Sequence, residues 1–135
     1  RFSIPEVDLG IPLAWGGIPR LVREIGPALT KELVMTCRPF DADEARAAGF
    51  LNRVVAEDRL DDEVDELAEA VASRPRFAVL ATKAHTNAVT EQMVGLARSW
   101  SDADGLAGGL RDSEGRAART QYLEKLMQAK HGSDA

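Results

Sequence analysis

The sequence predicts a helix-dominated α/β protein with two short strands. Apolar residues recur every four positions over residues 21–33, which is the spacing of one face of a helix. Further helical patterns cover most of the chain after residue 57. Two short runs rich in apolar and β-branched residues, 2–7 and 51–55, have the composition of strands.

Composition narrows the classes of protein. The chain of 135 residues can form one domain with a hydrophobic core. Its net charge of −5 argues against a nucleic-acid binder, which needs a basic face. Cys37 is the single cysteine, so no internal disulfide can form and a reducing compartment is expected. No apolar run is long enough to cross a membrane, and no signal peptide is visible. We therefore expect a cytoplasmic protein that binds neither nucleic acid nor membranes.

The first expected strand opens the chain. Residues 2–7 contain Pro5, which places this strand at an edge or an end of a sheet. Two short strands do not make an independent sheet, because their backbone groups need partners. We therefore expect that an N-terminal portion is absent from this sequence.

Turn and cap residues predict where the helices begin and end. Gly26 and Pro27 interrupt the first helical pattern, so two helices are expected, over residues 18–25 and 27–36. Asp41 and Glu44 have the spacing of a helix cap, and Gly49 is typical of a helix end.

The next helix is expected to be capped by Asp58 and to end before Pro75, and two more are expected over residues 77–93 and 113–130. Residues 101–112 carry three glycines, each of which lowers helix stability by about 1 kcal/mol. We expect this segment to be partly helical and mobile.

Several short motifs, taken in order, resemble those of one family. They are Pro5-Glu6, Leu9-Gly10, Gly16-Gly17, Arg20-Leu21, Asp43-Glu44-Ala45, Ala48-Gly49-Phe50-Leu51-Asn52-Arg53-Val54-Val55, Ala81-Thr82-Lys83 with Asn87, Ser113-Glu114-Gly115-Arg116 and Tyr122-Leu123-Glu124-Lys125. Each motif alone is weak, but the ordered set resembles the C-terminal half of the enoyl-CoA hydratase/isomerase family, the crotonase superfamily.

The resemblance implies a crotonase-like spiral fold built from ββα units and followed by helices that form trimers. Residues 1–56 would end the crotonase core, and residues 57–135 would form a C-terminal helical trimerisation region. The implied partners are an acyl-CoA thioester and further copies of the chain, as a homo-trimer or a dimer of trimers. The family's Gly-rich helix start and second catalytic Glu do not occur in this sequence.

Glu6 is the candidate catalytic residue. The resemblance implies that it exchanges a proton with the substrate α-carbon. An apolar pocket favours the protonated form of a carboxyl group, and Ile4, Val7 and Leu9 would supply such a pocket. The alternative is a solvated Glu at a strand end.

Ala14 and Trp15 are the candidate substrate-binding residues. Ala14 matches a family glycine whose backbone amide helps to place the reacting water. An alanine can offer the same N–H only if the backbone angles leave room for Cβ. Trp15 replaces a small residue, and it either narrows the acyl pocket or covers the core. Ile18 and Pro19 replace the usual Thr-Gln, which puts the placement of water in doubt.

Lys125 is a candidate contact for a phosphate of CoA, with an ordinary surface lysine as the alternative. No metal-ligand spacing occurs among His, Cys and acidic residues, so no metal is expected. The resemblance implies no cofactor, since acyl-CoA is the substrate.

The resemblance implies an enoyl-CoA hydratase, which adds water reversibly to a 2-enoyl-CoA thioester. Two alternatives stay open: an enoyl-CoA double-bond isomerase with Glu6 as its one acid/base, and a non-catalytic helical association module. A hydratase also needs two N–H groups aimed at the thioester oxygen. We therefore expect the isolated chain of 135 residues to be inactive.

Overall fold

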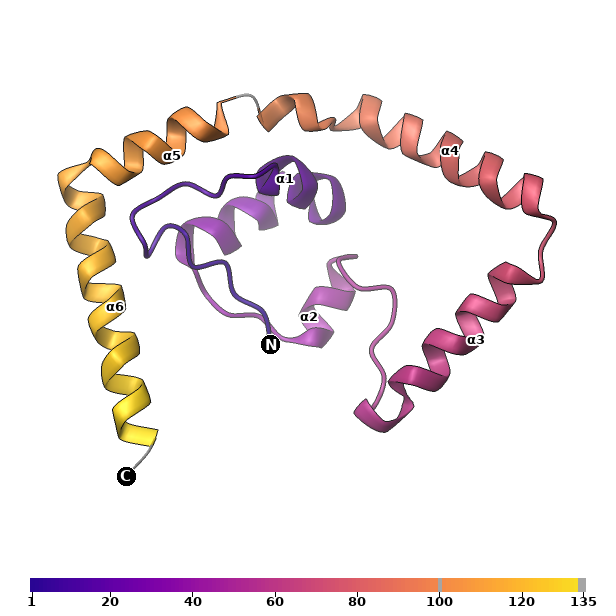
Figure 1. Cartoon of the computed structure of the whole chain (residues 1–135), viewed down its shortest axis with the longest axis horizontal. Helices are drawn as coiled ribbons and strands as arrows, with labels where there is room; N and C mark the ends of the chain where they lie inside the picture. The colour runs from indigo at the N-terminus through magenta and orange to yellow at the C-terminus, as the bar shows by residue number, and fades with distance from the viewer. Residues whose placement is uncertain (100, 134–135) are drawn as a thin grey trace.

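The computed structural model describes residues 1–99 and 101–133, and this part is almost entirely helical. The open arc of α3 to α6 surrounds the N-terminal segment, α1 and α2 (Figure 1). The elements in order are α1 (Gly17–Thr36), α2 (Ala42–Ala47), the 3-10 turn η1 (Glu57–Arg59), α3 (Leu60–Ala72), α4 (Arg76–Met93), the 3-10 turn η2 (Leu96–Ser99), α5 (Asp102–Arg111) and α6 (Ser113–Ser133).

A small core lies between α1, α2 and the beginning of the chain. Its buried centre is formed by Leu33 of α1, Phe40, and Ala45 of α2. Phe2 stacks on Phe40 with ring centroids 5.3 Å apart, and Phe50 meets Phe2 edge-on at 5.7 Å. Aromatic pairs at these separations add to the stabilisation that burial alone provides. The core therefore anchors the N-terminal segment against α1 and α2.

The expected division of the first helical region is confirmed. Gly26 has φ 76° and ψ 165°, a conformation outside the helical region, so α1 is two helical segments joined at a kink. Pro27 lacks an N–H and cannot continue the hydrogen-bond ladder across this point. The hydroxyl of Thr30 donates to the Gly26 carbonyl at 2.7 Å, which satisfies a group that the kink would otherwise leave free.

The expectation of two short strands is wrong. In the described part of the chain, residues 2–7 and 51–55 form no strand, and the extended pairing is a single antiparallel bridge between Phe2 and Phe40. The backbone folds into tight turns from residue 6, which breaks the run at 2–7. A strand is stable only when a neighbour satisfies its ladder of N–H and C=O groups, and residues 51–55 have no such neighbour here.

The cap predicted for α2 is confirmed. The Glu44 N–H donates to the Asp41 carboxylate at 2.8 Å, and Gly49 follows the helix with φ 87°. Arg38 then ties α2 to the end of α1, because its guanidinium binds Glu44 at 3.0 Å and Glu32 at 2.8 Å. The hydrogen bond from Arg38 holds the pKa of the Glu44 carboxyl below its usual range.

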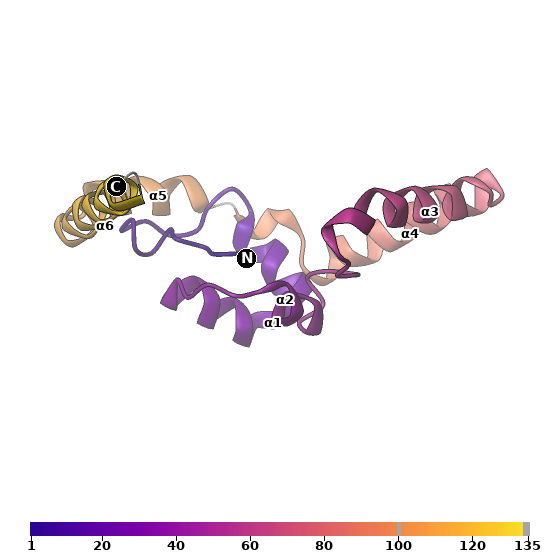
Figure 2. The same cartoon turned by 90° about the horizontal axis from the view of Figure 1, so that it is seen from below.

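The outer helices α3 and α4 bury little of their surface. Neither helix contains a buried residue, and both extend away from α5 and α6 (Figure 2). Their apolar side chains are therefore exposed: Leu60, Val64, Leu67 and Val71 on α3, and Phe77, Leu80, Val89 and Met93 on α4. The end of α4 approaches α1, where it lines a hollow with Arg23 and Glu24. Within the described residues, no helix is both long and apolar enough to cross a membrane.

The Gly-rich segment after residue 101 is more regular than expected. Residues Asp102–Arg111 form the continuous helix α5 rather than a partly helical stretch. The glycines reduce helix propensity, but Gly109 faces the backbone of the N-terminal segment at close range. Tertiary contact therefore favours glycine at this position.

Candidate functional site

The candidate catalytic residue Glu6 begins a compact turn. The Ile11 N–H donates to the Glu6 carbonyl at 3.0 Å, the Leu9 N–H donates to the Pro5 carbonyl at 3.1 Å, and the Gly10 N–H donates to the Val7 carbonyl at 2.9 Å. These bonds fix the backbone of Glu6 without a sheet. They also turn the chain at Asp8, so Asp8 does not share a strand face with Glu6.

The Glu6 side chain is half-buried, and its Oε2 atom is buried without a hydrogen-bond partner. The Nη2 atom of Arg119 on α6 is likewise buried without a hydrogen-bond partner. A buried polar group without a partner costs about 1–3 kcal/mol, so proteins seldom keep one without a use for it. Glu6 Oε2 and Arg119 Nη2 are thus two buried polar atoms that the described residues leave without a hydrogen bond.

Close backbone packing joins this turn to the last two helices. Gly10 has φ 69°, and a Cβ there would collide with the backbone of Gly115 on α6. A Cβ on Gly109 of α5 would lie 2.8 Å from the Gly10 carbonyl oxygen, and one on Gly115 would lie 2.7 Å from it. The three glycines thus let α5 and α6 support the turn that carries Glu6.

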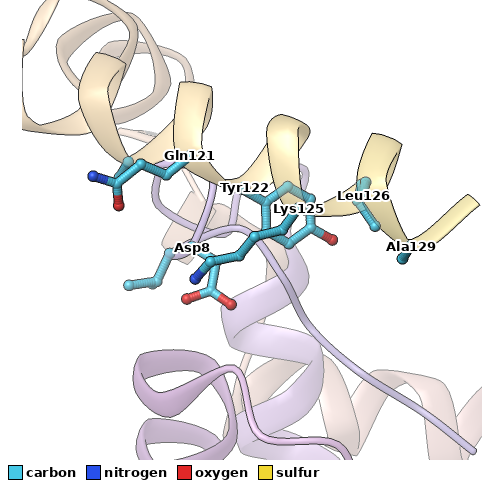
Figure 3. A pocket seen from close by; sticks show the side chains of 8 residues that line it. Asp8, Gln121, Tyr122, Lys125, Leu126 and Ala129 are labelled. Atoms are coloured by element: carbon cyan, nitrogen blue, oxygen red, sulfur yellow. The ribbon is translucent and has the colours of Figure 1, made fainter. Parts of the chain in front are cut away.

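Lys125 lines a hollow of about 490 Å³ between α6 and the turn. The hollow is also lined by Val7, Asp8 and Tyr122. The Lys125 amine and the Asp8 carboxylate both reach into it (Figure 3). A carboxylate beside the amine would weaken the binding of an anion, because like charges repel. A phosphate at Lys125 would therefore also need Asp8 to turn away.

Ala14 and Trp15 lie in a second tight turn. The Gly17 N–H donates to the Ala14 carbonyl at 3.0 Å, and the central residues Trp15 and Gly16 have φ values of 56° and 71°. Positive φ at both central positions is the pattern of a type I′ turn. Ala14 itself is buried at 3% exposure and is not among the residues with positive φ. Its Cβ therefore fits where the family has glycine.

The two candidate substrate-binding residues line a hollow of about 340 Å³ against α5. Trp15 is 70% exposed, so its indole does not cover the core. The opposite side of the hollow is formed by Asp102, Ala103 and Leu106 of α5. This hollow is separate from the one beside Lys125, and Glu6 lines neither. The structure thus places Ala14 and Trp15 at one hollow and Lys125 and Asp8 at the other.

Asp102 is a site residue that the sequence did not indicate. Its Oδ2 atom accepts the Gly16 N–H at 2.7 Å, across 86 residues of sequence. A left-handed conformation costs a residue such as Trp15 about 1–2 kcal/mol. A hydrogen bond contributes about 0.5–1.5 kcal/mol, which offsets much of that strain. No local motif marks Asp102, because its partner is set only by the docking of α5.

The sequence of this chain matches a known protein family. The family model for enoyl-CoA hydratase/isomerase matches residues 1–131. The chain belongs to the enoyl-CoA hydratase/isomerase family. The described part of this family member contains no cluster of three or more His, Cys, Asp or Glu residues that could hold a metal ion.

Relatives of this family member share moderate identity with it. The crotonyl-CoA hydratase of Syntrophomonas wolfei is 36% identical over 126 residues, which are 93% of this chain and 48% of that protein. The short-chain-enoyl-CoA hydratase of Clostridioides difficile is 45% identical over 83 residues, which are 62% of this chain and 54% of that protein. The chain thus spans about half the length of these curated relatives.

A solved structure supports the crotonase-like fold. A Streptomyces avermitilis protein assigned provisionally as an enoyl-CoA hydratase has a TM-score of 0.78 and 30% identity to this chain. The match covers 91% of this chain and 44% of that structure. The helix-dominated arrangement is therefore part of the family fold, although the two expected strands are not formed.

Proposed function

We propose that this chain supplies one wall of an acyl-CoA site in an enoyl-CoA hydratase. The observation that carries the proposal is the buried, unpartnered Oε2 atom of Glu6, held by the turn at residues 5–11. A carboxyl group in this state can transfer a proton to a carbon atom without competing with bulk water. The names of the hydratase relatives point to the same substrate class.

In the proposed reaction, water adds across the double bond of a 2-enoyl-CoA thioester. Glu6 exchanges the proton at the α-carbon while the oxygen of water joins the β-carbon. The Ala14 N–H helps to place that water; it makes no hydrogen bond to any residue that the structure describes. The Trp15 indole limits the space for the acyl group, and Lys125 contacts a CoA phosphate. The reaction needs no cofactor or metal.

The proposal is tested with Glu6→Gln in the natural gene product that contains these residues, with crotonyl-CoA as substrate. Glutamine keeps the size of the side chain but cannot exchange the proton, so turnover should fall by about 100- to 10,000-fold. Binding of crotonyl-CoA, measured by calorimetry, should change little. Wild-type turnover in this variant would rule out Glu6 as the acid/base. Glu57→Gln, on the exposed η1 turn, is the matched control.

The isolated chain of 135 residues should show no turnover of crotonyl-CoA. One carboxyl group does not stabilise the thioester enolate, which needs two N–H groups aimed at its oxygen. Measurable hydration by the purified chain, above the rate of its Glu6→Gln variant, would contradict this expectation.

Double-bond isomerisation remains the second candidate. A single carboxyl group can move a proton between two carbons, and Glu6 is the proposed acid/base for that step. Assaying the gene product with a 3-enoyl-CoA and a 2-enoyl-CoA separates the two reactions. Preferential conversion of the 3-enoyl-CoA would favour the isomerase. A folded gene product that acts on neither and does not bind acyl-CoA would favour the non-catalytic association module.

A further inference from the structure

One hydrogen bond joins the proposed substrate-binding turn to a helix distant in sequence. Asp102 is the first residue of α5 and follows the N-cap residue Ser101, so its carboxylate is not at the position that normally accepts from amides of the helix. Instead Oδ2 accepts the N–H of Gly16 at 2.7 Å.

The partner of this bond sits in a strained segment. Trp15 and Gly16 both have positive φ, and tryptophan rarely adopts that conformation. Such a conformation persists only where the surrounding structure holds it in place. Inside the turn the Gly17 N–H bonds to the Ala14 carbonyl at 3.0 Å, and from outside the turn Asp102 holds Gly16.

The turn and Asp102 also share one hollow. Ala14, Trp15 and Asp102 all line the space of about 340 Å³ between the turn and α5. Movement of Gly16 away from α5 would therefore shift both the Ala14 N–H and the Trp15 indole. The hydrogen bond from Gly16 to Asp102 therefore links α5 to the turn that lines this hollow.

We propose that Asp102 is a positioning residue for the acyl-CoA site: its carboxylate clamps Gly16 and thereby sets the Ala14 N–H and the Trp15 indole against substrate. The second half of this proposal rests on the proposed function. The clamp itself is a property of the turn and does not depend on that function. What Asp102 must supply is an acceptor oxygen in the right place, so an amide oxygen should serve as well as a carboxylate.

The test compares Asp102→Ala and Asp102→Asn in the natural gene product, with Asp104→Ala as matched control. Asp104 is an exposed acid in the same first helical turn, so its removal changes the helix-end charge but not the clamp. Hydrogen exchange of the peptide over residues 13–18 reports the turn directly. The kcat and KM for crotonyl-CoA report its effect on the reaction.

In Asp102→Ala, exchange of the Trp15 and Gly16 amides should rise at least about tenfold, because the clamp bond is lost. The kcat should fall by about 10- to 100-fold with a smaller change in KM, since misplaced groups slow the reaction more than they weaken binding. Asp102→Asn and Asp104→Ala should behave like the wild type in both measurements.

Three outcomes would overturn the clamp: unchanged exchange in Asp102→Ala, raised exchange in Asp102→Asn, or the same effect in Asp104→Ala. If Asp102→Ala fails to fold, Asp102→Leu takes its place, because it removes the acceptor oxygen but keeps most of the side-chain volume. Exchange of the Gly16 amide should again rise at least about tenfold, and unchanged exchange would overturn the clamp. If the wild type does not turn over crotonyl-CoA, the proposed function fails while the exchange measurements still test the clamp. Raised exchange with unchanged kcat would overturn the positioning role.

Discussion

Trp15 and Cys37 show how single residues bear strain in this chain. Both have positive φ, at 56° and 51°, where a side chain meets its own backbone. Next to Trp15, the Gly16 N–H donates a hydrogen bond to the Asp102 carboxylate. Cys37 caps the end of α1, a position where glycine is the usual residue. The two cases differ because only the strained turn at Trp15 is part of the candidate site.

Replacing Cys37 with glycine should stabilise the protein. Glycine removes the cost of about 1–2 kcal/mol that a side chain adds to a left-handed backbone conformation. Its greater conformational freedom in the unfolded chain lowers the free energy of unfolding by about 0.5–1 kcal/mol. The free energy of unfolding, measured by urea denaturation, should therefore rise by about 0.5–1 kcal/mol. Cys37→Ala is the control, since it removes the thiol but keeps the strain. An equal gain in both variants would show that the thiol, not the backbone, is responsible.

At the scale of elements, helix ends and helix contacts are decided by different physics. The cap at Asp41 and the ion pairs of Arg38 are local, and both sit within a few residues of α2. The contact between the Glu6 turn and the last two helices depends instead on the absence of side chains at Gly10, Gly109 and Gly115. Local hydrogen bonds and ion pairs therefore fix where α2 begins, whereas close backbone packing fixes how α5 and α6 dock against the N-terminal segment.

The two glycines at 108 and 109 should respond oppositely to alanine. A Cβ on Gly108 meets nothing within 4 Å, so Gly108→Ala should gain about 0.5–1 kcal/mol of helix propensity. A Cβ on Gly109 would lie 2.8 Å from the Gly10 carbonyl oxygen and 3.1 Å from the Ile11 Cα. Such a clash costs about 1–3 kcal/mol, which outweighs the gain of about 1 kcal/mol in propensity. Thermal denaturation of both variants measures the difference, and a stabilised Gly109→Ala would contradict the packing.

The pairing of Arg38 with Glu44 should make stability depend on pH. The folded-state pKa of Glu44 is lowered by the hydrogen bond from Arg38, so the folded state binds its proton less readily than the unfolded chain. The contribution of this pair to the free energy of unfolding is complete above the ordinary pKa of a glutamate, about 4.3. It is lost as pH falls through the lowered pKa of Glu44. Urea denaturation between about pH 6 and pH 3 measures this. Glu44→Gln should flatten that part of the profile, and an unchanged profile would contradict the pairing.

The whole molecule is extended, and much of its apolar surface lies on its outer helices. The buried apolar residues of the described part are few and lie near α1 and α2. The apolar side chains of α3 are exposed, with Leu67 at 49% exposure. Large exposed apolar faces on helices are typical of interfaces. Association through residues 57–135, as a homo-trimer or a dimer of trimers, stays a prediction.

Introducing charged residues into the exposed apolar face of α3 should weaken self-association. Val64→Asp together with Leu67→Asp places charges on the exposed apolar face of α3, where burial against another copy would require desolvating them. Analytical ultracentrifugation of the natural gene product should show a shift toward smaller species. Asp65→Ser with Glu69→Ser, on exposed positions of the same helix, is the control. An unchanged assembly would place the interface elsewhere.

The sequence by itself determined the helices, the kink at Gly26, the cap at Asp41 and the family. These follow from signals within one or two helical turns, or from motifs that any relative shares. It also indicated Glu6, Ala14, Trp15 and Lys125 as site residues, which remain predictions.

Only the tertiary structure decided that the runs at 2–7 and 51–55 form no strand, that Gly109 belongs in a regular helix, and that Asp102 holds Gly16. A strand depends on a neighbour that supplies its hydrogen bonds, and a close backbone contact depends on what lies opposite. The bond between Asp102 and Gly16 spans 86 residues. Such pairings are set when elements dock, so no local pattern of residues can specify them.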